Sequence, residues 1–216
     1  MASAAGLLTA SEAAVVSSVS VRDINRVIDE RILPADFISI EHGRHIFAAG
    51  CSLIAFYFES AKQLTSEQRL WAIGVAGPRL HRPLTMAKLL KEDWTLQDDY
   101  LTIDLAPFLR KTRDRLARLE AARAMVTSSP EILGGTPVIR GTRVPVYDVA
   151  ASVAANIPMD RILAAYPSID ADEVELASIY AEATPLRGRP RHHSPELAEP
   201  ARVLADRSIS RRRKAE

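Results

Sequence analysis

Apolar residues near the start of the chain recur at the three- and four-residue spacing of amphipathic helices, in two short segments separated by a serine-rich turn. Thr9 or Ser11 can cap a first helix that runs to Val16, because a side-chain oxygen there accepts a hydrogen bond from the first helical amides. A second helix begins at Ser20 or Val21. Its apolar side consists of Val21, Ile24, Val27, Ile28 and Ile32. The pattern predicts a helix-turn-helix unit.

A short β-hairpin is predicted next. Pro34 ends the second helix, and the apolar runs 37–40 and 45–47 then flank a turn that contains Gly43. A third helix is expected over about residues 51–63. Helix, turn, helix, hairpin, helix is the order of a winged helix-turn-helix. Over residues 7–75 this order resembles the head of the MerR-like DNA-binding group, and the resemblance implies a DNA-binding domain.

The polar side of the second helix offers candidate DNA contacts. A helix N-terminus favours phosphate, and Arg and Asn suit guanine and adenine edges. Arg44, at the predicted hairpin tip, could reach a phosphate as a wing does. The candidate DNA-binding residues are Ser20, Arg22, Asn25, Arg26 and Arg44. A solvated amphipathic helix in a protein-binding domain stays open as an alternative, since residues 1–70 hold six Lys and Arg against eight Asp and Glu.

Residues 76–125 are predicted to be a helical connector that ends in a long helix. Pro107 fits the first turn of that helix. An apolar stripe with basic residues outside favours a spacer or a dimerising helix, and the basic side is either solvated or in contact with phosphate. The stripe consists of Phe108, Leu109, Leu116, Leu119 and Met125.

Residues 126–183 contain a glycine- and proline-punctuated run followed by three segments of helical length. In the run, GGTPVIRGTRVPV, the glycines permit positive-φ turns and the prolines favour edge strands. We therefore expect a hairpin whose edge pairs with a second copy across a two-fold axis. The candidate dimerisation residues are Pro137, Val138, Ile139, Arg143, Val144 and Val146. Helices are expected over Val146–Asn156, Met159–Ala165 and Asp170–Ala183.

The same stretch closely resembles the bacterial antitoxin family of domain of unknown function 433. The resemblance rests on Pro130, on GGTPVIRGTRVPV, on ILAAYP and on DADEVELASIYAEA. It implies a VapB-type antitoxin that pairs with a PIN-like ribonuclease toxin, in a long form with an added N-terminal helix-turn-helix domain. It also implies a small hairpin plus helix-turn-helix domain that is commonly dimeric. After its capping Asp170, the last predicted helix carries Asp172, Glu173, Glu175 and Glu182 and no basic residue, so we assign DNA reading to the first domain and dimerisation to this one.

Residues 184–216 form a basic tail, with nine Lys and Arg against four Asp and Glu. Its beginning is rich in Pro and Arg, which favours disorder. A guanidinium can pair with the carboxylates that hold a metal in a PIN-like ribonuclease, and a basic tail that touches DNA is the alternative. The candidate toxin-binding residues are Arg187, Arg189, Arg191, Leu204, Ile209, Arg211, Arg212 and Arg213.

Composition and motifs argue against several other classes. The chain has 47% hydrophobic and 25% charged residues and one cysteine, which excludes an intrachain disulfide and favours a cytoplasmic setting. No signal peptide and no apolar stretch of roughly 18–20 residues, the length needed to cross a membrane, is evident. The glycines match no phosphate-binding fingerprint, and His42 and His45 lack further ligands. We therefore expect neither enzyme activity nor a metal or cofactor.

The leading hypothesis is an antitoxin that neutralises a PIN-like ribonuclease toxin and, as a homodimer, represses its own operon by binding operator DNA. A stand-alone dimeric transcriptional regulator is the alternative. An RNA-processing or nucleotide-handling enzyme is a third possibility, which metal-dependent cleavage by this chain alone would support.

Overall fold

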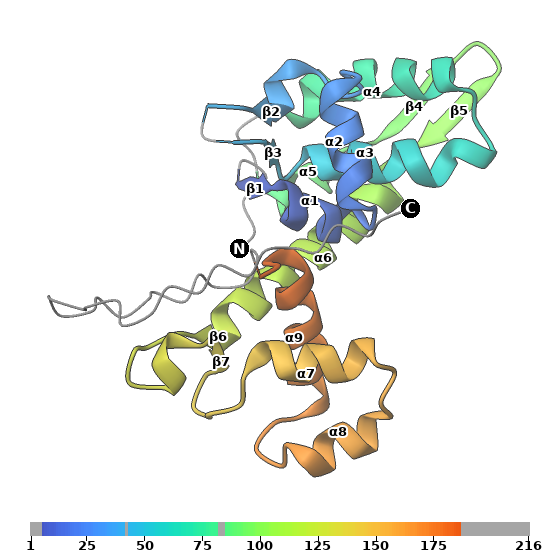
Figure 1. The fold of residues 1–216 in the computed structure, drawn as a ribbon. Helices are drawn as coiled ribbons and strands as arrows, with labels where there is room; N and C mark the ends of the chain where they lie inside the picture. The colour runs from blue at the N-terminus through green and yellow to red at the C-terminus, as the bar shows by residue number, and fades with distance from the viewer. Residues whose placement is uncertain (1–5, 42, 82–84, 187–216) are drawn as a thin grey trace, which may run out of the picture. The chain divides into compact units, whose positions relative to one another are not determined.

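The computed structural model describes residues 6–41, 43–81 and 85–186, which are mainly helical with short antiparallel hairpins (Figure 1). This confirms the predicted fold class. The order of helix, turn, helix, hairpin and helix is also present in the first part of the chain. Its elements are β1 (Leu7–Thr9), α1 (Ala10–Ser17), α2 (Val21–Asp29), β2 (Ile38–Ser39), β3 (His45–Phe47) and α3 (Gly50–Glu59).

The predicted hairpin belongs to a three-stranded antiparallel sheet in the order β1-β3-β2. Ile46 is the central residue, because it lies opposite Leu8 of β1 and opposite Ile38 of β2. Ile46 and Leu8 are buried in the core. Strand β1 was not predicted, since three residues are too few to show an alternating pattern. It fastens the hairpin to the start of α1, so the hairpin has a fixed place beside the two helices.

Side-chain caps set the starts of α1 and α2, and they decide between the starting residues that the sequence left open. Thr9, not Ser11, caps α1, and it forms a capping box with Glu12. Ser20 caps α2 through a capping box with Asp23, so α2 begins at Val21. Each cap fixes the chain just before its helix, and the Ser20 cap therefore helps to fix the turn between α1 and α2.

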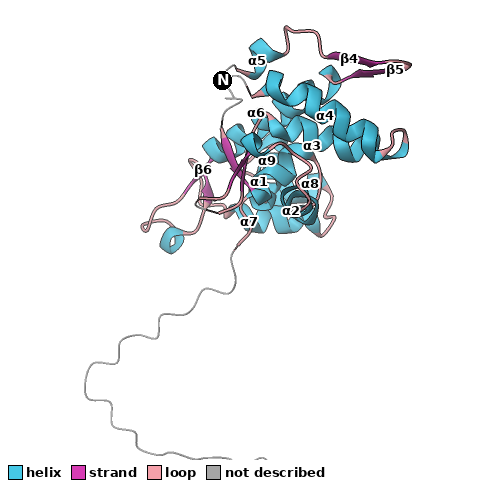
Figure 2. Cartoon of the chain, turned by 90° about the horizontal axis from the view of Figure 1, so that it is seen from above, coloured by secondary structure: helices cyan, strands magenta, loops and turns pink. Residues whose placement is uncertain are grey.

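The next elements do not form a separate connector. They are α4 (Ser66–Leu80), α5 (Met86–Leu89), β4 (Thr95–Asp98), β5 (Leu101–Asp104) and α6 (Ala106–Met125). Helix α4 runs through residue 75, and one hydrophobic core extends from Leu8 to Leu119. The domain boundary predicted after residue 75 is therefore corrected, because these elements complete the core of the first part. Figure 2 shows the unpredicted pair β4 and β5 side by side at the edge of the helices.

The last elements form a second, smaller core. They are β6 (Val126–Thr127), a 3-10 turn (Leu133–Gly135), β7 (Val138–Ile139), α7 (Val146–Ala154), α8 (Met159–Ala165) and α9 (Ala171–Ala183). The small core contains Ile139, Val146, Val149, Ile162 and Val174. Helix α9 packs on α7 and also on α6 and α1, and its Ala183 joins the larger core. None of the described helices is long and apolar enough to cross a membrane.

Candidate nucleic-acid interface

The outer side of α2 carries most of the predicted DNA contacts. Ile24 and Val27 are fully buried, so they hold α2 against the core and turn its polar side chains outward. The polar side chains line a shallow hollow and are called the α2 face below. Its residues are Ser20, Arg22, Asp23, Asn25, Arg26, Asp29 and Glu30.

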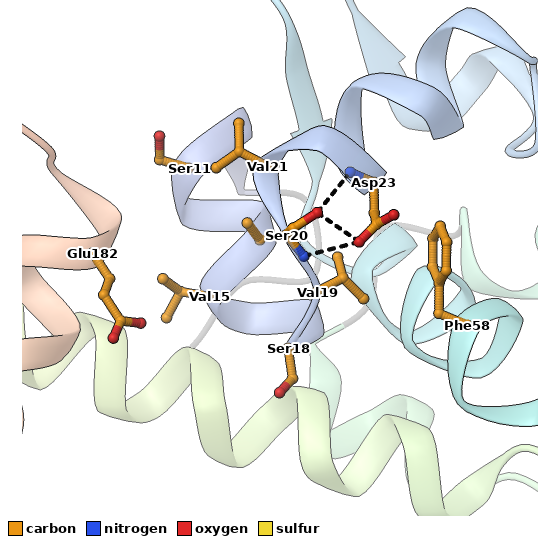
Figure 3. Close-up of a pocket in the computed structure, with 10 residues that line it drawn as sticks. Ser11, Val15, Ser18, Val19, Ser20, Val21, Asp23, Phe58 and Glu182 are labelled. Atoms are coloured by element: carbon orange, nitrogen blue, oxygen red, sulfur yellow. Dashed lines mark hydrogen bonds between the residues drawn. The ribbon is translucent and has the colours of Figure 1, made fainter.

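Ser20 is the N-cap residue of α2. Its Oγ accepts a hydrogen bond from the Asp23 amide at 3.1 Å and donates one to Asp23 Oδ2 at 2.6 Å. The Ser20 amide also donates to Asp23 Oδ2, at 3.1 Å. This capping box, drawn with dashed lines in Figure 3, engages the hydroxyl of a residue that was predicted to contact DNA. Ser20 therefore positions the start of α2.

Arg44 brings the hairpin to the α2 face. Its Nη1 donates to Asn25 Oδ1 at 3.1 Å, and its Nη2 lies 2.8 Å from Asp29 Oδ1. The neighbouring Gly43 has φ +113, a backbone conformation that L side chains rarely adopt. The structure thus places Arg44 and Asn25 together, as a wing beside a recognition helix would be, but it directs the Arg44 guanidinium at α2 rather than at solvent.

The two arginines of the α2 face itself, Arg22 and Arg26, differ in their surroundings. Arg26 Nε lies 3.0 Å from Glu30 Oε1, and this hydrogen bond with Glu30 raises the pKa of Arg26. Arg22 is exposed and has no ion pair with any described residue. The α2 face with Arg44 therefore carries three guanidinium groups and three carboxylates, those of Asp23, Asp29 and Glu30. Because an exposed i,i+4 pair is weak and screened by salt, phosphates can compete with Glu30 for Arg26.

A second hollow, whose lining includes several apolar side chains, lies beside the start of α2. Val15, Val19, Val21 and Phe58 supply apolar surface, and the rim includes Glu182 from the end of α9 (Figure 3). None of its lining residues is basic. It therefore adds no phosphate-binding group to the α2 face.

The last helix is acidic, as the sequence indicated, and its acids have a partner inside the chain. Arg118 of α6 pairs with Asp172, and its Nη2 lies 2.9 Å from Glu175 Oε2. The hydrogen bond with Asp172 raises the pKa of Arg118 although its small burial lowers it. Together with the packing of α9 on α1, α6 and α7, these pairs fix α9 as a structural helix between the two cores.

The candidate dimerisation residues form the expected hairpin, but strand β6 occupies the other edge of β7. Strand β7 pairs with β6, and residues 143–146 fold back on it: the Ile139 amide donates to the Val144 carbonyl at 3.0 Å, and the Val146 amide donates to the Pro137 carbonyl at 3.1 Å. Val138, Ile139 and Val146 are 0% exposed. This corrects their assignment, because they are core residues of their own chain. The dimer contact stays a prediction for Pro137, Arg143 and Val144.

Several predicted residues cannot be placed. The candidate toxin-binding residues Arg187, Arg189, Arg191, Leu204, Ile209, Arg211, Arg212 and Arg213 lie outside the described residues, as does His42. His45 Nδ1 lies 3.2 Å from the Gly43 carbonyl oxygen. Among the described residues no three His, Cys, Asp or Glu side chains gather as metal ligands would.

The sequence reasoning gave no role in the site to four residues that join distant elements: Glu12, Asp29, Arg118 and Arg123. Arg123 Nη2 lies 2.5 Å from Glu12 Oε1, which ties the last turn of α6 to the first turn of α1. Asp29 follows Asn25 by one helical turn, a spacing that places the two on one side of α2. That spacing was a usable signal for Asp29. The other three pair across distances in sequence that local patterns do not reveal.

The fold and the face together define a mainly helical protein with a helix-turn-helix and three-stranded-sheet head and a second hairpin-and-helix part. Residues 126–181 match a protein family described as "Protein of unknown function (DUF433)". The chain is 61% identical over 216 residues to "Uncharacterized protein y4eO" of Sinorhizobium fredii (strain NBRC 101917 / NGR234), covering 99% of this chain and 97% of that protein. The chain belongs to the family of that protein and carries the DUF433 domain. No solved structure matches it.

Proposed function

We propose that the chain is a DNA-binding repressor whose head reads DNA with the α2 face, and that it acts as the antitoxin of a toxin-antitoxin pair. The observation that supports DNA binding is the placement of Arg44, from the hairpin, against the exposed polar side of a capped helix. A single helix fits the major groove, and a flanking hairpin can follow the phosphate backbone. Arg22 and Arg26 are the cations that would meet DNA.

The antitoxin part rests on the DUF433 match and on the resemblance of residues 130–183 to VapB-type antitoxins. It includes a homodimer, which presents two heads to two half-sites, and a PIN-like ribonuclease as the protein partner. The proposed activity is binding, not catalysis. A stand-alone regulator without a toxin is the other reading of the same head.

The test of DNA binding uses the fragment immediately upstream of the chain's own coding sequence, measured by fluorescence anisotropy at several salt concentrations. Arg22→Ala should weaken binding about tenfold and make the salt dependence shallower by about one charge. Arg161→Ala is the matched control, because Arg161 is also exposed but lies on α8 in the DUF433 part. If Arg161→Ala weakens binding and Arg22→Ala does not, the head is not the reader.

The antitoxin role is tested by coexpression with the product of the adjacent gene. Copurification, together with loss of that product's ribonuclease activity in the complex, would support the pair. Deletion of residues 185–216 should abolish inhibition and leave the dimer intact in light scattering. Inhibition that survives the deletion would refute toxin binding by the tail, and no copurifying partner would favour the stand-alone regulator.

A further inference from the structure

We propose that Arg44 and Asp29 are positioning residues that orient Asn25 for base reading, and that Arg44 is not itself a phosphate contact. This inference rests on the proposed DNA-binding function of the head. It differs from the usual role of an arginine at the tip of a wing, which is to neutralise a phosphate.

The contacts of Arg44 carry the inference. Its two terminal nitrogens are both engaged, one with Asn25 Oδ1 at 3.1 Å and the other with Asp29 Oδ1 at 2.8 Å. The two acceptors lie one helical turn apart on α2, so the planar guanidinium bridges two successive turns of that helix. Arg44 comes from a hairpin that is 19 residues away in sequence from Asn25. The bridge therefore fixes the hairpin relative to the helix.

The bridge also fixes the amide of Asn25. Only its oxygen can accept a hydrogen bond from a guanidinium, so Arg44 determines which way the amide faces. Nδ2 donates to no described residue. Asn25 therefore meets the groove with its Nδ2 donors, which suit the acceptor N7 of a purine. Without Arg44 the amide is free to rotate, and the discrimination at that base pair is lost.

Asp29 keeps Arg44 in this role. Its carboxylate neutralises the guanidinium and holds it toward α2, so the cation is not attracted to the nearest phosphate. The pair is half exposed, with side-chain exposures of 46% for Arg44 and 57% for Asp29. Pairs this exposed add little to stability, so both residues can be replaced without unfolding the head.

The experiment compares Arg44→Ala and Asp29→Asn with the wild type on the upstream fragment and on a scrambled fragment, each over a range of salt concentrations. If Arg44 positions Asn25, both variants lower the ratio of the two affinities, about tenfold for Arg44→Ala. The slope of log affinity against log salt stays the same in Arg44→Ala. The matched control for Asp29→Asn is Asp36→Asn, an exposed acid of the same head, which should leave the ratio unchanged.

The phosphate-contact model gives opposite results. It predicts that Arg44→Ala weakens binding to both fragments equally and flattens the slope by about 0.9. It also predicts that Asp29→Asn leaves the ratio of the two affinities unchanged. Either result overturns the inference and leaves the proposed DNA binding intact. Failure of the wild type to bind either fragment overturns both.

A measurement without DNA completes the test. In the free wild-type protein the side-chain amide protons of Asn25 should have resolved NMR shifts, and in Arg44→Ala they should move to the values of a solvated amide. Asn25 shifts that are unchanged by Arg44→Ala would contradict the bridge itself.

Discussion

Glu12 links the helix-turn-helix head to the helix that leads into the DUF433 domain, and its removal should destabilise both. Its Oε1 lies 2.5 Å from Arg123 Nη2 on α6, and its Oε2 accepts a hydrogen bond from the Thr9 amide at 2.9 Å. The side chain of Glu12 is 13% exposed and that of Arg123 is 43% exposed. Two substitutions separate these interactions. Glu12→Gln keeps an acceptor for the cap and loses the charge, whereas Glu12→Ala loses both.

The expected losses follow from the exposure of the pair. An ion pair with one half-exposed partner contributes at most about 1 kcal/mol, so Glu12→Gln should lower the free energy of unfolding by about 0.5–1 kcal/mol. Loss of the capping interaction adds about 1 kcal/mol, so Glu12→Ala should lose about 1.5–2 kcal/mol in total. Urea denaturation followed by circular dichroism measures both values. Glu120→Gln is the control, since Glu120 is exposed on α6 without an ion pair to any described residue.

The pH dependence of the difference provides a second check. Burial raises the pKa of Glu12, but the hydrogen bonds from Arg123 and Thr9 together outweigh burial, and the pKa is lowered from its ordinary value of 4.5. A lowered pKa in the folded state means stability that is present above the unfolded value and is lost as the pH falls through the folded value. The gap between wild type and Glu12→Gln should therefore be constant near pH 7 and shrink below about pH 4.5. Equal stability of Glu12→Gln and Glu120→Gln at pH 7 would refute the reasoning.

Two further predictions concern the cores. Burial raises the pKa of the Cys51 thiol to about 12, although the Ser17 hydroxyl beside it acts in the opposite direction. A thiol reagent at pH 8 should therefore label the protein only as urea unfolds it. Rapid labelling of the native protein would show that the thiol is accessible. Ile139→Ala removes a fully buried side chain of the small core and should lower the free energy of unfolding by about 2–5 kcal/mol. Ile157→Ala changes a side chain that is 42% exposed and should alter that free energy by about 0.5 kcal/mol or less. Similar losses in the two variants would contradict the assigned core.

Local signals predicted most of the helices, although α4 (Ser66–Leu80) was not among them. The capping boxes at Thr9 and Ser20, and the one at Asp170, mark helix starts within a residue, because each needs only a side chain and an amide three positions apart. Helix α8 has the predicted bounds, Met159–Ala165. These features depend on interactions inside a single turn of chain, which is what a sequence pattern records.

Strands were harder to predict, because their signals are shorter. In β4 and β5 the buried Leu96 and Ile103 lie opposite each other and alternate with exposed neighbours, so a period-two pattern was present. The turn between them lacks glycine, and Asp99 adopts φ 41 in its place. In the DUF433 part, β7 pairs with the nearer residues 143–146, as predicted, and also with β6, from the end of α6, which was not predicted. A two-residue strand that pairs with a distant partner leaves no local pattern.

The candidate site was predicted in its residues but not in its contacts. Arg22, Asn25 and Arg26 are on the solvent side of α2 because helical periodicity requires it. The pairing of Arg44 with Asn25 and Asp29 depends on the sheet that fixes the hairpin, and β1, which completes that sheet, was itself unpredicted. Errors in the site thus follow from errors in the strands.

The charges on α2 and α9 favour the head over the DUF433 part for the proposed DNA binding. Helix α9 is packed on three other helices, and its exposed charges are the carboxylates of Asp172, Glu175 and Glu182, which would be repelled by a phosphate backbone. The α2 face has as many guanidinium groups as carboxylates once Arg44 is included, and its Arg26–Glu30 pair is exposed enough for DNA to replace it. Since Arg26 and Arg44 are already paired in the free protein, the electrostatic attraction between one head and DNA phosphates is weak. In the proposed DNA-binding dimer, specific binding would then depend on base contacts and on two heads acting together, because a second linked site raises affinity without adding charge.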